Sequence, residues 1–265
     1  MEVLSQTDQT RRENGQQHTG VYIEIHNLTM AYGDFIIQRD LNFTISRGDV
    51  FIIMGGSGCG KSTLMKHLIG LKPPASGDII IDGMNYWKAQ PREQEALKQR
   101  FGVMFQAGAL WSSLTLAENI ALPLGEYTKL SDKQIAEVVS LKLALVGLSG
   151  FEEFYPSQIS GGMRKRASLA RAIALDPEIV FFDEPSAGLD PISSRRLDNL
   201  ILELSNSLRM TVVIVTHELA SIFAIGNNSV FLDADTKTML TTGDPNILRN
   251  DTSNPKVKNF LNRGE

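Results

Sequence analysis

The sequence predicts an α/β fold with a mostly parallel sheet, and three short apolar runs predict its central strands. These runs are residues 50–54, 179–182 and 212–215. Each is apolar at every position, which is typical of strands that are buried on both faces of a parallel sheet. Each is also linked to a segment with helical periodicity, as expected for strand–helix units.

Two segments near the start alternate apolar and polar residues and predict strands that pair antiparallel. They are residues 21–26 and 41–46. A period of two places the apolar side chains on one face, so these strands are half-buried. Residues 1–19 are polar and are expected to form a disordered tail.

Strand signals disappear between about residues 107 and 175, where helical periodicity takes over. We interpret this segment as an α-helical subdomain inserted into one domain that spans residues 20–246. Beyond residue 217 we expect a short helix, strands at 230–232 and 238–241, and helical pieces at 245–249 and 255–261. Residues 247–265 would then form a C-terminal helical tail.

The amino-acid composition indicates a globular protein and argues against several functional classes. Hydrophobic residues make up 42% of the 265 residues and charged residues 21%, which is ordinary globular usage. The net charge of −4 lacks the basic excess of nucleic-acid binders, so no nucleic-acid partner is expected. A single cysteine fits a reducing compartment. No stretch reaches the roughly 18 consecutive apolar residues of a membrane span, and the first 20 residues contain no apolar core of a secretion signal.

A glycine-rich loop follows the first apolar run and precedes a helix expected at 61–70. The loop consists of Gly55, Gly56, Ser57, Gly58, Cys59, Gly60, Lys61 and Ser62. This spacing matches the phosphate-binding loop, whose backbone N–H groups surround phosphate oxygens. Lys61 is expected to reach the β- and γ-phosphates of ATP, Ser62 to ligate Mg²⁺, and Thr63 to hold the α-phosphate through its N–H. Cys59 has no paired base and is expected to be a small loop residue, not a nucleophile.

Polar side chains follow the other apolar runs at the same edge of the sheet. Asp183 and Glu184 follow the second run, and His217 follows the third. Ligands of open α/β sheets bind at this edge. Asp183 is expected to hold Mg²⁺, Glu184 to polarise the attacking water, and His217 to contact the γ-phosphate. Gln106 ends a strand-like segment at 101–105 and is expected to contact Mg²⁺ or the water.

Residues 159–163 read Ile-Ser-Gly-Gly-Met and precede a helix expected at 164–175. They resemble the LSGGQ signature of ABC ATPases, with departures at Ile159 and Met163. In that family two subunits meet head to tail, and each signature caps the nucleotide held by the other subunit. The resemblance covers about residues 21–245 and implies such a role for Ser160, Gly161 and Gly162. We take the basic run at 164–166 as a solvated helix face.

Further motifs occur in the family's order. Tyr32 resembles the aromatic residue that stacks on adenine, and residues 186–190, ending at Asp190, resemble the D-loop. Gln106 resembles the Q-loop glutamine and His217 the switch histidine. The resemblance therefore implies a P-loop ABC ATPase core with an antiparallel β subdomain and an inserted helical subdomain. It also implies a second copy of the chain as a partner.

The segment 105–124 resembles the ATPases of Mla and Mce type phospholipid transporters, and so does the SGGM form of the signature. This resemblance implies a multi-pass permease, a periplasmic lipid-binding MCE subunit, a possible small STAS-like regulator, and a place at the cytoplasmic face of a bacterial inner membrane. Two alternatives stay open: the ATPase of an amino-acid or lipoprotein ABC transporter, and a soluble ABC ATPase.

Overall fold

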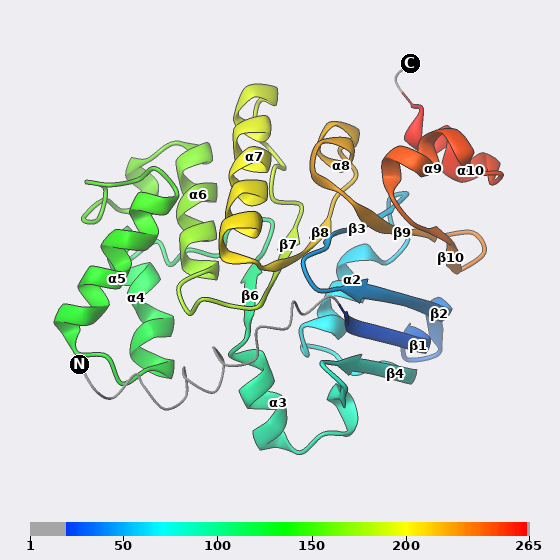
Figure 1. Cartoon of the computed structure of the whole chain (residues 1–265), viewed down its shortest axis with the longest axis horizontal. Helices are drawn as coiled ribbons and strands as arrows, with labels where there is room; N and C mark the ends of the chain where they lie inside the picture. The colour runs from blue at the N-terminus through cyan, green and yellow to red at the C-terminus, as the bar shows by residue number, and fades with distance from the viewer. Residues whose placement is uncertain (1–19, 264–265) are drawn as a thin grey trace.

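The computed structural model describes residues 20–263, which contain two β-sheets and a group of helices (Figure 1). The expected tail at 1–19 lies outside the described residues. The larger sheet has six strands in the order β10-β9-β3-β8-β7-β6. Its strands are β3 (Val50–Gly55), β6 (Phe101–Met104), β7 (Ile179–Asp183), β8 (Thr211–Val215), β9 (Asn228–Asp233) and β10 (Thr238–Thr242). All neighbours pair parallel except β9 and β10.

The α/β prediction is confirmed, and the apolar runs are buried on both faces as expected. In β3, Val50, Ile52 and Met54 belong to a core shared with the helices, whereas Phe51 and Ile53 belong to a second core. The second core is shared with α2 (Lys61–Leu68) and the smaller sheet. Because successive side chains of a strand point to opposite faces, a strand between two cores needs apolar residues at every position.

The smaller sheet is antiparallel, with the order β2-β1-β4-β5. The two expected strands are confirmed as β1 (Val21–Tyr32) and β2 (Phe35–Ser46), and β4 (Ser76–Ile81) and β5 (Met84–Asn85) extend the sheet. The 3-10 helix η1 (Tyr86–Lys88) and α3 (Pro91–Lys98) lead from this sheet to β6. The sequence analysis missed these elements at 76–98.

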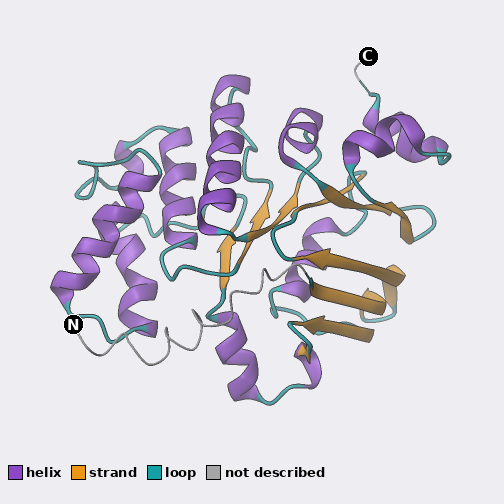
Figure 2. Cartoon of the chain, in the orientation of Figure 1, coloured by secondary structure: helices purple, strands orange, loops and turns teal. Residues whose placement is uncertain are grey.

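Three helices form a lobe at one end of the molecule, away from the antiparallel sheet (Figure 2). They are α4 (Leu116–Tyr127), α5 (Asp132–Leu145) and α6 (Gly161–Ala172), with the 3-10 helix η2 (Pro156–Gln158) before α6. The helix expected at 164–175 therefore begins earlier, because the Ser160 hydroxyl accepts from the Met163 N–H and caps it. None of these or the other described helices is long and apolar enough to cross a membrane.

The chain then returns to the sheet at β7, and α7 (Pro191–Leu208) and α8 (Leu219–Ile225) connect β7 to β8 and β8 to β9. After β10 it ends in α9 (Pro245–Asp251) and α10 (Pro255–Leu261). Val257 and Leu261 of α10 are fully buried in the helix-side core, and the Phe260 ring packs edge-on against Phe231 of β9. The last described helix is therefore part of the packed structure.

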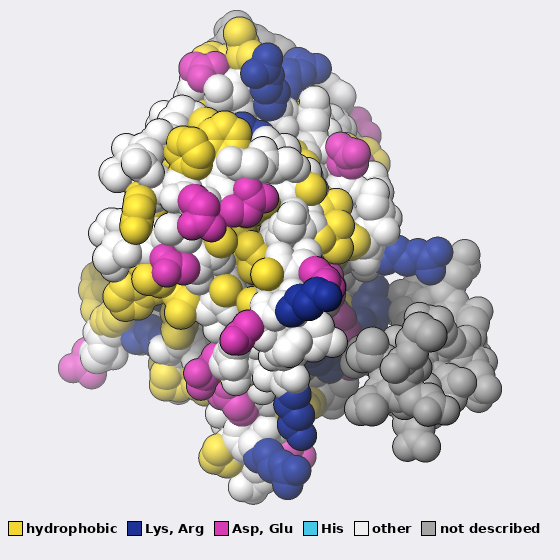
Figure 3. Space-filling model, turned by 90° about the vertical axis from the view of Figure 1, so that its left-hand side faces the viewer, with side chains coloured by type: hydrophobic (Ala, Val, Ile, Leu, Met, Phe, Trp, Pro, Cys, Tyr) yellow, Lys and Arg dark blue, Asp and Glu magenta, His cyan; other side chains and the backbone are white. Residues whose placement is uncertain are grey.

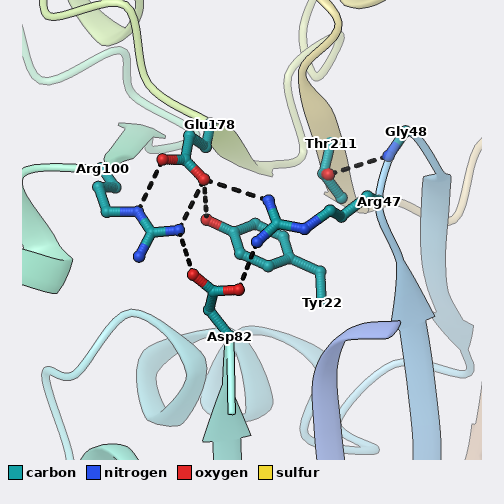
Figure 4. A network of polar contacts seen from close by, with 7 residues as sticks. All are labelled: Tyr22, Arg47, Gly48, Asp82, Arg100, Glu178 and Thr211. Atoms are coloured by element: carbon teal, nitrogen blue, oxygen red, sulfur yellow. Dashed lines mark hydrogen bonds and ion pairs between the residues drawn. The ribbon is translucent and has the colours of Figure 1, made fainter. Parts of the chain in front are cut away.

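A network of ion pairs joins the two sheets at the amino ends of the parallel strands (Figure 4). Glu178, just before β7, accepts from Arg100 at 2.6 and 2.9 Å and from Arg47 at 3.2 Å. Asp82, just after β4, accepts from the same two arginines. Tyr22 of β1 donates to Glu178 and lies 4.1 Å below the Arg47 guanidinium. These contacts fix the antiparallel sheet to the edge opposite the predicted site.

Candidate functional site

The glycine-rich loop connects β3 to α2 at the carboxyl end of β3, as predicted. Gly55 has φ 145°, and a Cβ there would lie 2.3 Å from the Leu232 carbonyl oxygen. Gly60 caps α2 with φ 97°. Both positions therefore need glycine, for space at Gly55 and for backbone conformation at both. The resulting turn directs the start of α2 into the loop, which is the geometry of an anion site at a helix N-terminus.

Two side chains hold this loop in shape. Lys61 Nζ donates to the Gly55 and Gly56 carbonyls at 3.0 Å each. Gln38, which is fully buried in β2, donates to the Cys59 carbonyl at 2.8 Å and to the Asp233 carbonyl at 2.9 Å. Burial raises the pKa of the Cys59 thiol although Lys61 acts to lower it. A buried thiol with a raised pKa is a poor nucleophile, in agreement with the role predicted for Cys59.

Oxygen ligands for a hard cation lie together beside the loop. Ser62 Oγ donates to Asp183 Oδ1 at 3.0 Å, so the start of α2 meets the end of β7. The described residues contain no group of three or more His, Cys, Asp and Glu side chains that could hold a metal by themselves. One hydroxyl and one carboxylate fit Mg²⁺, which is commonly bound by one or two protein oxygens together with substrate phosphates.

Glu184 and His217 lie close together and line the same groove as the glycine-rich loop. His217 Nδ1 lies 2.7 Å from Glu184 Oε1. The glutamate side chain is 12% exposed and the histidine 57%. Glu184 has φ 48°, and its N–H donates to the Val215 carbonyl at 2.8 Å. A non-glycine residue at positive φ is uncommon and often occurs at functional sites. Glu184 Oε2 is buried without a hydrogen-bond partner among the described residues.

A groove of about 640 Å³ brings most of the predicted residues together. The predicted residues that line it are Gly55, Ser57, Gly58, Gly60, Lys61, Ser62, Thr63, Gln106, Glu184 and His217. Its other walls come from residues that the sequence analysis did not select: Phe35, Ile36, Ile37, Ala234, Lys237 and Arg263. Arg263, beyond α10, also donates to the His217 carbonyl. The groove thus combines a phosphate loop, a carboxylate and a histidine.

The signature residues lie outside this groove. Ser160 is exposed at the start of α6, and Gly161 lines a second groove of about 260 Å³ together with Gln106, Gly188 and others. Asp190 caps α7 and accepts from the Ile192 and Ser193 N–H groups at 3.0 Å each. The hydrogen bonds from Ser193 and Ile192 hold the pKa of Asp190 below its usual value. Within one chain, the start of α6 therefore does not reach the phosphate loop.

Tyr32 does not line the 640 Å³ groove. It is 51% exposed at the end of β1, and Lys72 Nζ lies 3.8 Å from its ring centre. The aromatic residue that lines the groove is Phe35, which is 65% exposed and lies under Lys237. Adenine stacking by Tyr32 stays a prediction.

The basic run at 164–166 is not a solvated face, and this part of the sequence analysis was wrong. Arg164 is exposed, but Lys165 is only 8% exposed and donates to the Gln106 carbonyl at 2.6 Å. Arg166 donates to the Val146 and Gly147 carbonyls. Burial lowers the pKa of Lys165, while the nearby Glu184 and Glu218 act to raise it. The sequence showed the charges but not the carbonyl groups that accept from them.

The sequence analysis also missed how the segment after Gln106 is held. Asn119 of α4 is fully buried; it accepts from the Trp111 N–H at 2.8 Å and donates to three carbonyls, including that of Leu114. Arg171 of α6 donates to the Gly108 and Ala109 carbonyls. An asparagine beside the apolar residues of α4 was the signal of this role in the sequence.

Known proteins are similar to this chain in sequence and in fold. The model of the ABC transporter family matches residues 38–187. The Mycobacterium tuberculosis protein mkl, named as a probable ribonucleotide transport ATP-binding protein, is 42% identical over 92% of this chain and 67% of its own length. The intermembrane phospholipid transport system ATP-binding protein MlaF is 39% identical in Haemophilus influenzae, over 92% of this chain and 90% of that protein. MlaF of Escherichia coli is 35% identical, over 93% and 90%.

Two solved structures have the same fold. An ATP-binding cassette, solved as a dimer in a post-hydrolysis state with ADP and Pi, is 28% identical with a TM-score of 0.75; the match covers 84% of this chain and 98% of that one. A part of the ABC transporter complex cbiONQ from Clostridium perfringens is 25% identical with a TM-score of 0.79, over 86% and 90%.

Proposed function

The chain belongs to the ABC transporter family as an ATP-hydrolysing subunit, and from this premise we propose that it powers phospholipid transport between the inner and outer membranes in an Mla/Mce-type complex. The observation that carries its ATPase chemistry is the groove in which the phosphate loop, Gln106, Glu184 and His217 lie together. The observation that favours phospholipid as cargo is the likeness to MlaF along nearly the whole of both chains.

In this proposal the loop from Gly55 to Thr63 binds the triphosphate of ATP. Its N–H groups and the start of α2 attract the phosphates. When ATP binds, Lys61 gives up its hydrogen bonds to the Gly55 and Gly56 carbonyls and donates to β- and γ-phosphate oxygens instead. Ser62 and Asp183 would hold Mg²⁺, with Gln106 as a further oxygen ligand. When bound, the ion would neutralise charge that develops on the phosphates.

Glu184 acts as the base in this proposal. Its carboxylate accepts a hydrogen bond from the attacking water and directs the water's lone pair at the γ-phosphorus. His217, whose Nδ1 lies 2.7 Å from Glu184 Oε1, would contact a γ-phosphate oxygen through its other ring nitrogen. Oε2 of Glu184 is buried without a hydrogen-bond partner among the described residues, and the attacking water would supply the partner that it lacks.

A second copy would complete the site. The first turn of α6, capped by Ser160 and containing Gly161 and Gly162, offers free N–H groups to an anion, yet it lies outside the groove of its own chain. Two chains that meet head to tail would each supply this turn to the other's γ-phosphate, with Asp190 and its neighbours at the contact. The similar cassette solved as a dimer supports this arrangement.

The partners follow from the likeness to the phospholipid transport ATPase. We propose a peripheral place at the cytoplasmic face of a bacterial inner membrane, through a multi-pass permease, with an MCE lipid-binding subunit and a STAS-like protein as further partners. The helical lobe offers a surface for such contacts: Leu122, Tyr127, Leu141 and Leu145 of α4 and α5 are exposed. Figure 3 shows hydrophobic side chains gathered among acidic ones on the side of the molecule where this lobe lies.

Affinity purification of the tagged chain from detergent-solubilised native membranes, followed by mass spectrometry of proteins and lipids, tests this proposal. We expect a multi-pass permease, an MCE protein and phospholipid. A complex that contains a permease and retains nucleotide cargo instead of phospholipid would favour the cargo named for mkl. A set of soluble partners without any permease would overturn the transport proposal and leave the ATPase in place.

A further inference from the structure

Two side chains of α6 donate hydrogen bonds to main-chain carbonyls of the segment that begins at Gln106. Lys165 Nζ donates to the Gln106 carbonyl at 2.6 Å. Arg171 donates to the Gly108 carbonyl at 3.1 Å and to the Ala109 carbonyl at 2.6 Å. Three carbonyls within four residues of the chain thus accept hydrogen bonds from two cations of one helix.

The backbone of this segment is shaped for these contacts. Gly108 has φ 77° and Ala109 φ 52°, so two consecutive residues are left-handed. A Cβ on Gly108 would lie 2.5 Å from Ser168 Oγ, which leaves no room for a side chain between the segment and α6. Lys165, Ser168 and Arg171 are three residues apart, and such residues are neighbours along a helix surface. One strip of α6 therefore contacts the whole segment.

The same helix carries the signature turn. Gly161 begins α6, and Lys165 follows about 6 Å further along the helix axis, at 1.5 Å per residue. A helix of 12 residues moves as a unit over this distance. A shift of α6 would therefore move the donor that the Gln106 carbonyl accepts from, and the Gln106 residue also lines the ATP groove.

We propose that Lys165, supported by Arg171, is a positioning residue that links α6, which begins with the signature turn, to Gln106. Gln106 then contacts the nucleotide only when α6 is in the position that lets Lys165 donate to the Gln106 carbonyl. The inference rests on the proposed role of Gln106 in the site. Lys165 does not touch ATP itself. Its ammonium sets the position of a main-chain carbonyl, and it lies close enough to Glu184 and Glu218 for their charges to act on it.

The test compares Lys165→Met with a control from the same helix. Arg166→Met removes a cation that also donates to carbonyls, those of Val146 and Gly147, but away from the groove. We expect Lys165→Met to lower kcat about tenfold or more, as loss of a charge-assisted hydrogen bond predicts, while KM for ATP and the Kd of a fluorescent ATP analogue with Mg²⁺ stay within about twofold. Lys165→Arg should recover most of kcat, and Arg166→Met should match the wild type.

Hydrogen exchange of the amides at 106–110 supplies a second readout. In Lys165→Met these amides should lose protection with MgATP present, and in Arg166→Met they should keep it. If Lys165→Met does not fold, Lys165→Gln, which keeps a donor without the charge, takes its place.

A wild-type kcat in Lys165→Met would overturn the inference, as would an equal loss in Arg166→Met or a failure of Lys165→Arg to recover activity. Gln106→Ala separates the two proposals. If Gln106→Ala lowers kcat and Lys165→Met does not, the link to α6 fails while the role of Gln106 stands; if Gln106→Ala has no effect, the role itself fails.

Discussion

Replacing Glu178 with glutamine should destabilise the fold without touching the ATP groove. Glu178 accepts three hydrogen bonds from Arg100 and Arg47, and its side chain is 34% exposed. Hydrogen bonds to charged groups contribute about 1.5–3 kcal/mol each when buried, and partial exposure reduces this. The glutamine side chain keeps one acceptor oxygen, but its NH₂ group replaces the second oxygen and faces the guanidinium groups, which are also donors. We expect a loss of about 2–3 kcal/mol, or a fall in Tm of about 4–6 °C for a chain of this size.

The effect should depend on pH in a defined direction. Hydrogen bonds and charge from Arg100 and Arg47 outweigh burial and hold the pKa values of Glu178 and Asp82 below their usual values. A carboxylate whose folded pKa is lowered contributes stability above its unfolded pKa, near 4, and that contribution is lost as pH falls through the folded pKa. The difference in Tm between the wild type and Glu178→Gln should therefore be constant from about pH 8 to 5 and shrink below about pH 4.

Thermal unfolding followed by circular dichroism measures this effect. Asp78→Asn is the control, because Asp78 pairs with Lys88, whose side chain is 70% exposed, and lies outside the network of Glu178; its Tm should be close to that of the wild type. The reasoning fails if Glu178→Gln has the wild-type Tm at pH 7, or if the difference in Tm is the same at pH 3 as at pH 7.

Three further changes test individual residues. Lys61→Ala should weaken MgATP binding about 10- to 100-fold, because charge-assisted bonds to phosphate are lost; calorimetric titration that returned an unchanged Kd would contradict this. His217→Ala should lower kcat about 10²–10³-fold with little change in Kd, measured by phosphate release; a loss confined to Kd would argue against a transition-state role. Asp198 is 3% exposed, and burial raises its pKa. A raised acid pKa costs stability as pH rises, so Asp198→Asn should increase Tm at pH 8 and approach the wild type near pH 4; an equal or lower Tm at pH 8 would refute it.

The main sheet and the phosphate loop were predictable because their signals are local. A strand between two cores must be apolar at each position, as residues 179–182 are, and the loop needs glycine where φ is positive, as at Gly55 and Gly60. Within the missed segment 76–98, β5 has only two residues and η1 three. Such short elements depend on pairing with distant strands, which a local pattern does not reveal.

The contacts that hold the site were hidden for a different reason. Lys165 and Arg171 donate to main-chain carbonyls. Because every residue type has a carbonyl, the sequence contains no complementary side chain that would predict these contacts. Gln38 holds the loop in the same way, through the Cys59 carbonyl. Residues whose side chains face the site from a strand end could be predicted from the sequence. Residues that hold the backbone of the site in position could be identified only from the three-dimensional structure.

The central claim is that two copies of the chain share each ATP, and Glu184→Gln tests it most directly. This change keeps the side chain's shape and removes the base, so hydrolysis should stop while MgATP still binds. Analytical ultracentrifugation of this variant should detect a stable dimer in MgATP and monomers in its absence, and adding Ser160→Arg should abolish the dimer without loss of ATP binding to the loop. Normal hydrolysis by Glu184→Gln, or a MgATP-bound variant that stays monomeric regardless of Ser160, would contradict the account.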